Sequence, residues 1–251
     1  MAWTVRRLPY GGQRTDPHRD HIVTVGGQLR TGHYGEVMEK PRLNLHRPQR
    51  LSPITAEEFI SRPTAEGRLL KSAVLEDEHL RDAHLVECVA EGLTVLNSDL
   101  TGFTAVESSI EQLTAPELRC ARSTWRSVSL TGSRIGAAEL YDAEWAGVQV
   151  SASKVDLINL RGATLTDVLL ENCQIGELDL GATSVHRLAL IHCTVETLVL
   201  SGATLRDVDL RGAELRHITG IDHLRGATVS PLQLQELAPH LAAQAGIAVS
   251  D

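Results

Sequence analysis

Every fifth residue from Leu75 to Leu215 is apolar, and no insertion interrupts this grid. The grid has 29 positions, yet only 42% of the chain is apolar, so chance does not produce it. An amphipathic helix repeats its apolar face every three to four residues and a half-buried strand every two. Neither element alone explains a period of five, so the grid indicates a structural repeat.

A second column of small or apolar residues stands two positions before the first, as at Ala83, Cys88 and Ala163. Residues two apart in an extended segment point the same way, so each pentapeptide offers two inward side chains. The other three positions, often polar and several times Gly, can turn a corner. Each pentapeptide is thus predicted to form one side of a coil. The expected core consists of Leu75, Leu85, Trp125, Leu140, Trp145, Leu160, Leu165, Leu170, Leu180, Leu190, Leu200, Leu205, Leu210 and Leu215.

The grid resembles the pentapeptide repeat family, and the sequence GATL at 162–165 and 202–205 carries the resemblance most clearly. The resemblance implies an all-β fold, a right-handed quadrilateral β-helix with four pentapeptides per coil, hence about seven coils for the 29 units. Positions 20 residues apart would then stack, which places Trp125 beside Trp145 with Ala105 below them. A leucine-rich repeat, the rival fold, needs a period of about 20 to 29 residues and fails on spacing.

The sequence divides into four parts. Residues 1–50 form a basic, irregular leader, which we expect to be flexible and within which Met38 could be the true translation start. Residues 51–71 are expected to form an N-terminal cap, and residues 72–219 the β-helix. Residues 220–251 are expected to form a C-terminal cap with an amphipathic helix that could pair two chains.

Both caps carry helix-start signals. Thr55 and Glu58 have the spacing of a capping box, which predicts a short helix around 55–61. Ser230 followed by Pro231 has the form of an N-cap residue and a first helical residue.

No apolar run approaches the roughly 20 residues that span a bilayer, so we expect a soluble, cytoplasmic protein. Four scattered cysteines predict free thiols. Of these, Cys173 and Cys193 lie one coil apart in the expected geometry, where a reducing cytosol favours stacked, inert thiols over a disulfide.

The sequence contains no nucleophile elbow, phosphate-binding loop, dinucleotide fingerprint or zinc signature. His18, Asp20, His21 and His33 lie together in the leader but lack metal-ligand spacing. We therefore expect no catalytic activity, no cofactor and no metal site.

Charge is distributed unevenly along the chain. Residues 1–50 hold nine Lys or Arg against four Asp or Glu, whereas residues 72–111 hold nine acids against Arg81 alone. An acidic rod cannot bind DNA by releasing counterions, but it can present a negative field to a DNA-binding protein. This favours DNA mimicry, with a partner-binding surface made of Glu76, Asp77, Asp82, Glu87, Glu91, Glu107 and Glu111.

The family includes fluoroquinolone-resistance proteins that occupy the DNA-binding saddle of DNA gyrase and dimerise through C-terminal helices. The resemblance implies that a type II topoisomerase is the partner and that the chain forms a homodimer. The dimer contact would involve Leu232, Leu234, Leu237 and Leu241.

The alternative is a generic interaction scaffold for another protein, with the basic leader as a second contact. Four arginines interrupt the acidic surface midway, at Arg119, Arg122, Arg126 and Arg134. Segregation of the acids onto one or two faces would favour mimicry, and an even spread would favour the scaffold.

Overall fold

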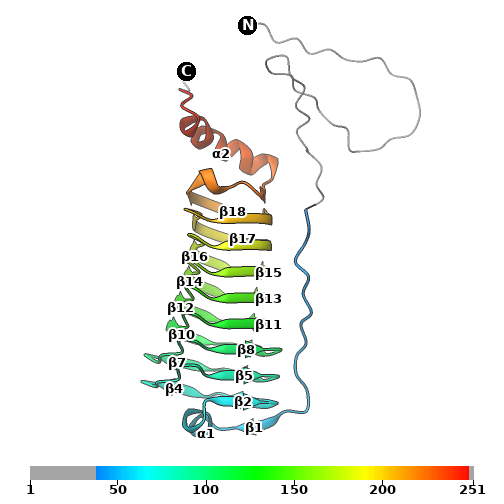
Figure 1. Ribbon diagram of the computed structural model, residues 1–251, viewed down its shortest axis with the longest axis vertical. Coiled ribbons are helices and arrows are strands. Elements are labelled where there is room, and N and C mark those ends of the chain that lie inside the picture. The colour runs from blue at the N-terminus through cyan, green and yellow to red at the C-terminus, as the bar shows by residue number, and fades with distance from the viewer. Residues whose placement is uncertain (1–37, 249–251) are drawn as a thin grey trace, which may run out of the picture. The chain divides into compact units, whose positions relative to one another are not determined.

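The computed structural model describes residues 38–248, which form a parallel β-helix closed by a helix at each end (Figure 1). The expected fold class is confirmed. Most of the leader, including the histidine cluster at 18–33, lies outside the described residues.

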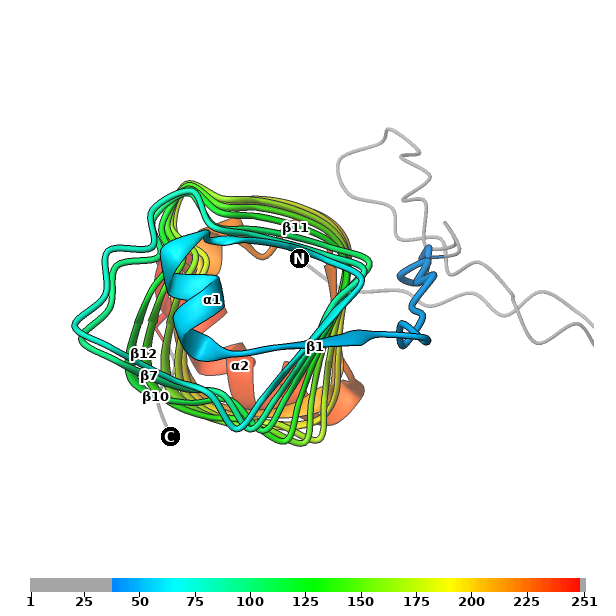
Figure 2. The ribbon, with the colours of Figure 1, turned by 90° about the horizontal axis from the view of Figure 1, so that it is seen from below.

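Short strands stack in columns, and each column is one face of the coil (Figure 2). One face begins with β2 (Thr64–Glu66), β5 (His84–Val86) and β8 (Thr104–Val106). The next contains β1 (Ser52–Ile54), β3 (Arg68–Lys71), β6 (Val89–Glu91) and β9 (Ser109–Glu111). Both faces continue in β11 (Thr124–Thr131), β13 (Glu144–Ser151) and β15 (Thr164–Glu171), which bend around the corner between them.

A third face contains β4 (Val74–Glu76), β7 (Thr94–Leu96), β10 (Thr114–Arg119), β12 (Arg134–Glu139), β14 (Lys154–Asn159) and β16 (Gln174–Asp179). The ends of β10 to β16 turn onto the fourth face, where the isolated bridges His79↔Asp99 and Asp99↔Arg119 continue the stack. Two long strands, β17 (Ser184–Val199) and β18 (Thr204–Thr219), run around several faces, and the short β19 (Ala227–Thr228) pairs with β18.

Strand partners are 20 residues apart and parallel, as in Leu165↔Val185 and Trp125↔Trp145. The structure has about nine turns, where the sequence analysis expected about seven. The coil starts earlier than residue 72 because Ala65 and Leu70 extend the apolar grid backwards and are buried. It also gains the pairing of β19 at the other end.

The interior is the predicted ladder of aliphatic side chains. All the expected core residues are buried except Leu215 in the last coil, which is partly buried and packs against the core. The predicted stacking of Trp125 on Trp145 is confirmed, with ring centroids 5.6 Å apart. Ala105 pairs with Trp125 from the coil below and leaves room for the indole.

Several residues of the second inward column are serines or threonines, and their hydrogen bonds explain why. The buried Ser108 hydroxyl donates to the carbonyls of Val106 (2.7 Å) and Leu85 (3.3 Å), and it accepts the amide of Cys88 at 3.0 Å. Buried backbone groups need such partners. These hydroxyls therefore satisfy corner backbone groups that the strand ladders leave open.

Most corners place one residue in the left-handed region, with φ between 45° and 60° at non-glycine positions such as Asn97 and Arg187. Asp, Asn and Gly tolerate this conformation best. Gly162 has a φ of 70° and needs no strain to adopt it, while Asp142 and Ala182 hold the same conformation at the equivalent corner of the neighbouring coils.

Both cap helices start where the sequence predicts. Helix α1 (Ala56–Ser61) has Thr55 and Glu58 in a capping box and buries Phe59 against the first coil. A 3-10 turn, η1 (Ile221–His223), precedes helix α2 (Pro231–Gln244), whose N-cap is Ser230. The buried Gln233 side chain donates to the carbonyls of Leu210 (2.7 Å) and Ala213 (2.8 Å), so α2 covers the last coil with a polar anchor.

Candidate functional site: an acidic face crossed by a basic strap

Residues 38–50, here called the strap, run in an extended path along the stack of coils (Figure 1). Glu39 bonds to Asp207 in the last complete coil, Arg42 to Asp167, and Arg47 to Glu111 further down. The chain then enters β1, which pairs with β3. The strap therefore runs from the C-terminal end of the β-helix to its N-terminal end. The face that it crosses, made of residues 88–91 and their equivalents every 20 residues, is called the strap face.

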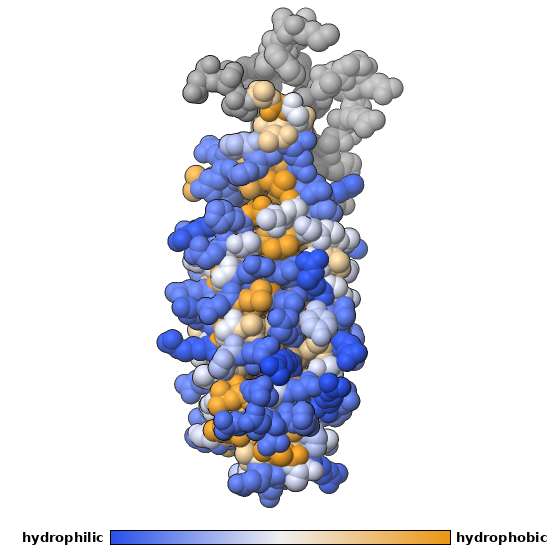
Figure 3. Space-filling view, turned by 90° about the vertical axis from the view of Figure 1, so that its left-hand side faces the viewer, coloured by the Kyte–Doolittle hydropathy of each residue, from blue (hydrophilic) through white to orange (hydrophobic). Residues whose placement is uncertain are grey.

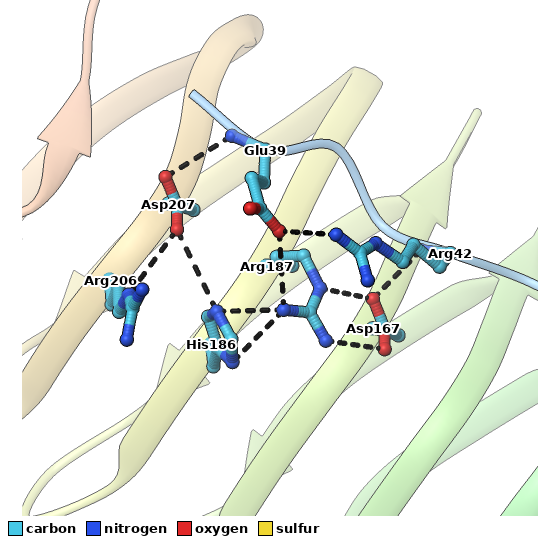
Figure 4. Close-up of polar contacts among 7 residues, drawn as sticks. All are labelled: Glu39, Arg42, Asp167, His186, Arg187, Arg206 and Asp207. Carbon is cyan, nitrogen blue, oxygen red and sulfur yellow. Dashed lines mark hydrogen bonds and ion pairs between the residues drawn. The ribbon is translucent and has the colours of Figure 1, made fainter. Parts of the chain in front are cut away.

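The upper part of the strap is fixed by a network of charged side chains (Figure 4). Arg187 donates two hydrogen bonds to Asp167 in the coil below and lies 3.5 Å from the Glu39 carboxylate. Asp167 also accepts the backbone amide of Arg42 at 2.8 Å. These donors, Arg187 first, lower the pKa of the Asp167 carboxyl. Asp207 accepts the Glu39 amide at 3.1 Å and lies near His186.

The lower part is fixed by one arginine. Arg47 Nε donates to Glu111 Oε1 at 2.7 Å, and Nη2 lies 3.5 Å from Oε2. This contact is the main reason that the pKa of the Glu111 carboxyl is lowered. Between the charged contacts, Pro41, Leu43, Leu45 and Pro48 are partly buried, while Arg42, Asn44 and His46 are exposed. The strap thus turns its apolar side chains toward the coils.

The outward side chains of the strap face, called its floor, differ in size and burial. Val89, Ser109 and Ala189 are at most 6% exposed, whereas Ser129, Gln149, Leu169 and Asp209 of the same column are partly buried. The strap crosses this face. Acidic residues stand on both sides of the floor. Glu87, Glu107, Asp167 and Asp207 line one corner, and Glu91, Glu111 and Glu171 lie on the other side.

The seven predicted partner-binding acids do not form one cluster. Glu87, Glu91, Glu107 and Glu111 border the strap face in two successive coils. In contrast, Glu76 lies on β4, Asp77 at the following corner and Asp82 one corner further on. The structure therefore brings four of the seven together.

A second polar feature lies on the fourth face, a surface hollow of about 550 Å³. Its lining includes His79, Asp99, Arg119, Glu139 and Tyr141. Thr101 donates to Asp99 and, with Arg81, lowers the pKa of that carboxyl to about 2. Figure 3 shows the molecule from the side of β4 to β16 in Figure 1, where hydrophilic residues predominate and hydrophobic ones form separate patches.

Sequence reasoning missed the strap because it grouped residues 38–50 with the irregular leader. A usable signal was present, since Pro41, Leu43 and Leu45 alternate with polar residues, as in an extended segment with one buried side. Nothing local indicates where that side binds, because Glu39 and its partner Asp207 are 168 positions apart.

Other sequence expectations concern groups elsewhere in the chain. All four cysteines are free and buried, as predicted. Within residues 38–248 no group of three or more His, Cys, Asp or Glu side chains could hold a metal ion. No helix in the same range is long and apolar enough to cross a membrane.

The four leucines expected in a dimer contact differ in exposure. Leu232 is 65% exposed and Leu234 51% exposed, whereas Leu237 is buried and Leu241 partly buried. Leu237 therefore holds α2 on its own β-helix, and the first two leucines are available at the surface.

No family model and no curated protein matches the chain. Among solved structures, it is similar to QnrB1, a plasmid-mediated fluoroquinolone resistance protein. One QnrB1 structure has 16% identity and a TM-score of 0.34 and covers 75% of this chain and 93% of that one. A second has 17% identity and a TM-score of 0.29, with 79% and 95% covered.

The chain is also similar to HetL, a pentapeptide repeat protein involved in heterocyst differentiation regulation from the cyanobacterium Nostoc. The identity is 16% and the TM-score 0.22, with 70% of this chain and 97% of HetL covered. Likeness at these levels concerns the fold alone. The chain's own geometry, with an inward residue at every fifth position and strand partners 20 residues apart, is that of a parallel β-helix with four five-residue sides per coil.

Proposed function

We propose that this protein acts by binding a protein partner through the acidic surface of its β-helix and catalyses no reaction. The observation that carries the proposal is the row of carboxylates at Glu87 and Glu107, with Glu91 and Glu111 beside it. Successive coils are about 4.8 Å apart, so these charges are closely spaced along a stiff support. Glu91 and Glu111 already pair with Lys71 and Arg47, but the exposed carboxylates of Glu87 and Glu107 can meet a partner with a basic surface without any need to order a loop.

We propose further that the partner is a DNA-binding protein, a type II topoisomerase such as DNA gyrase, and that the acidic surface mimics DNA. Duplex DNA carries one negative charge per roughly 1.7 Å of axis, and proteins that bind it carry complementary basic surfaces. A row of carboxylates on a rigid rod resembles such a charge distribution and repels DNA itself. The sequence resemblance to fluoroquinolone-resistance proteins favours this partner over other DNA-binding proteins.

The test is a gyrase supercoiling assay with and without a fluoroquinolone, with the protein titrated to micromolar levels. We expect inhibition of supercoiling, or protection from the drug, at stoichiometric amounts. The double substitution Glu87→Lys and Glu107→Lys should weaken the effect. The control is Asp156→Lys, an exposed acid on β14 of another face, which should leave it unchanged. No effect of the wild-type protein would contradict the topoisomerase proposal.

A generic interaction scaffold is the second candidate. The observation that favours it is the position of Glu76, Asp77 and Asp82 on a different face and different corners from the other four predicted acids. A partner that used these residues would contact the β4 side. A pull-down from cell lysate would identify such a partner. A protein that binds the β4 side should be captured by the wild type but not by the Glu76→Lys or Asp77→Lys variant.

We also propose that α2 pairs two chains through Leu232 and Leu234, the exposed leucines of the helix. Light scattering should give a dimer mass for the wild type and a monomer mass for the double variant Leu232→Ser and Leu234→Ser. A wild-type protein that is still a monomer at about 100 µM, where a dimer with a binding free energy of about −5.5 kcal/mol would be populated, would contradict the proposal.

A further inference from the structure

Charged side chains of the strap and of the strap face are only partly paired with each other. Within the described residues, its Lys40 and Arg50 form no ion pair, although both are basic and exposed. On the other side of the contact, Glu87 and Glu107 are exposed at the corner of the strap face, and no described residue pairs with either. Basic side chains of the strap and acidic side chains of the strap face therefore both remain without an ion-pair partner in the part of the chain that the structure describes.

The strap also shares no backbone ladder with the face that it crosses. In the described chain, the first backbone bond between this segment and the coils is from Ser52 to Gly67, after the strap has ended. Only two strap amides, those of Glu39 and Arg42, bond to the coils, and both bond to side-chain carboxylates. The strap can therefore leave without breaking the hydrogen bonds that hold the coils together.

We propose that the strap face is a docking site for an extended basic peptide of a partner protein, and that the strap occupies this site until the partner displaces it. The strap itself shows which chemistry fits. Its apolar side chains stand at alternate positions and are partly buried toward the coils. Arg47 reaches the Glu111 carboxylate on one side of the face, and the backbone amides of Glu39 and Arg42 bond to Asp207 and Asp167 on the other. A peptide whose bases also reach Glu87 and Glu107 would make contacts that the strap does not make.

Charge complementarity identifies the occupant as basic. The strap carries Lys40, Arg42, Arg47 and Arg50 against Glu39, and seven acids border the face, against Lys71, Arg187 and Arg211. Glu91 and Asp167 already pair with Lys71 and Arg187, but a like-charged peptide would leave Glu87 and Glu107 unpaired. The inference stands independently of the topoisomerase proposal, because it concerns a peptide site and is tested without any enzyme.

The probe is a fluorescent synthetic peptide with the sequence of residues 38–50, titrated by anisotropy onto the full chain. Arg47→Glu places two carboxylates together at Glu111 and should open the face. If the strap covers the site at least nine-tenths of the time in the wild type, opening it should tighten binding about tenfold. The matched control is Arg134→Glu, which makes the same change in net charge at an exposed residue of β12 and leaves the strap closed.

A second variant tests where the peptide binds. Arg47→Glu combined with Glu111→Lys restores an ion pair of reversed polarity, so the strap should close again and the peptide should bind no better than to the wild type. Arg47→Glu combined with Asp156→Lys has the same net charge and should keep the tighter binding. If Arg47→Glu proves unfolded by circular dichroism, Leu43→Ser with Leu45→Ser loosens the strap through its apolar contacts.

The proposal is overturned if Arg134→Glu binds the peptide as tightly as Arg47→Glu, because attraction by net charge would then explain both. It is also overturned if the reversed ion pair does not reduce binding, or if no folded, strap-loosened variant binds the peptide more tightly than the wild type does. Tenfold tighter binding that only the Glu111 substitution abolishes supports it.

Discussion

The Arg187 guanidinium forms a bidentate ion pair with the Asp167 carboxylate one coil below it. Nε lies 2.6 Å from Oδ1 and Nη2 lies 2.8 Å from Oδ2. The two side chains are only 11% and 15% exposed, because the strap lies over them and Glu39 and Arg42 contact the pair. The ion pair thus joins two coils and the strap at one point.

We expect Arg187→Met to lower the free energy of unfolding by about 1.5–3 kcal/mol, the usual effect of a lost hydrogen bond to a charged group. Asp167 would keep the Arg42 amide but lose both guanidinium donors. Urea unfolding followed by circular dichroism measures the change. Arg206→Met is the control, since Arg206 is exposed and its pair with Asp207 is 3.6 Å long. That variant should stay within about 0.5 kcal/mol of the wild type.

Stability should fall in acid. Arginine donors lower the pKa of Asp167, Glu111 and Asp209 in the folded state, and Thr101 with Arg81 lowers that of Asp99 to about 2. Each group has a lower pKa folded than unfolded, where the value is about 4. Its contribution is therefore complete above about pH 5 and is lost as pH falls toward the folded pKa.

Urea unfolding at pH 6, 4 and 3 measures this dependence. The combined substitution of Arg47 and Arg187 by Gln should flatten it, because the carboxylates at Glu111 and Asp167 then titrate closer to their unfolded values. Equal stability of the wild type at pH 6 and pH 3 would refute this prediction.

The core ladder should not tolerate a charge. Leu165 and Leu180 are each 1% exposed, and a carboxylate placed there has no partner. Leu165→Asp or Leu180→Asp should therefore prevent folding, while Leu165→Ala should cost about 2–5 kcal/mol. Thermal melting distinguishes these outcomes, with Leu232→Ala on the exposed side of α2 as a nearly neutral control. A cooperatively melting Leu165→Asp protein would show that the residue is not in the core.

All four thiols are buried and should therefore react slowly in the native protein, Cys88 and Cys120 most slowly. Burial raises the pKa of the Cys120 thiol to about 12 and raises that of Cys88 as well, so little thiolate is present at neutral pH. The thiolate is the reactive form. A chromogenic disulfide reagent should react with all four thiols in denaturant and only slowly without it. Rapid native reaction at any cysteine would indicate that its coil opens readily.

The five-residue grid was sufficient to predict the sides of the coil and the core, because both depend on residues that recur at fixed spacing. The tryptophan stack also required the 20-residue coil, which the family resemblance implied. Both helix starts were equally predictable, since Thr55 has a capping-box partner three positions away and Ser230 is followed by Pro231; the capping box of Ser230 with Gln233 was not predicted. The coil count was too low because Ala65 and Leu70, which precede the clear repeat, were assigned to the cap.

The acidic surface was only partly predictable. Charge counts identify the acids, but the corner at which each one stands depends on its position within the 20-residue coil. Asp77 and Asp82 are five residues apart and therefore occupy different corners, whereas Glu87 and Glu107 share one. The place where the strap binds was not predictable, because its contacts join residues that are 64 to 168 positions apart.

The direction of the strap has a consequence for biosynthesis. A ribosome makes residues 38–50 before any coil exists, yet their binding partners Asp167 and Asp207 emerge among the last. While the coils form one after another, this segment stays exposed to solvent. It can bind along its full length only after the last complete coil has been translated. A truncated chain would keep its first segment unattached, within reach of the proteases that remove unfinished proteins.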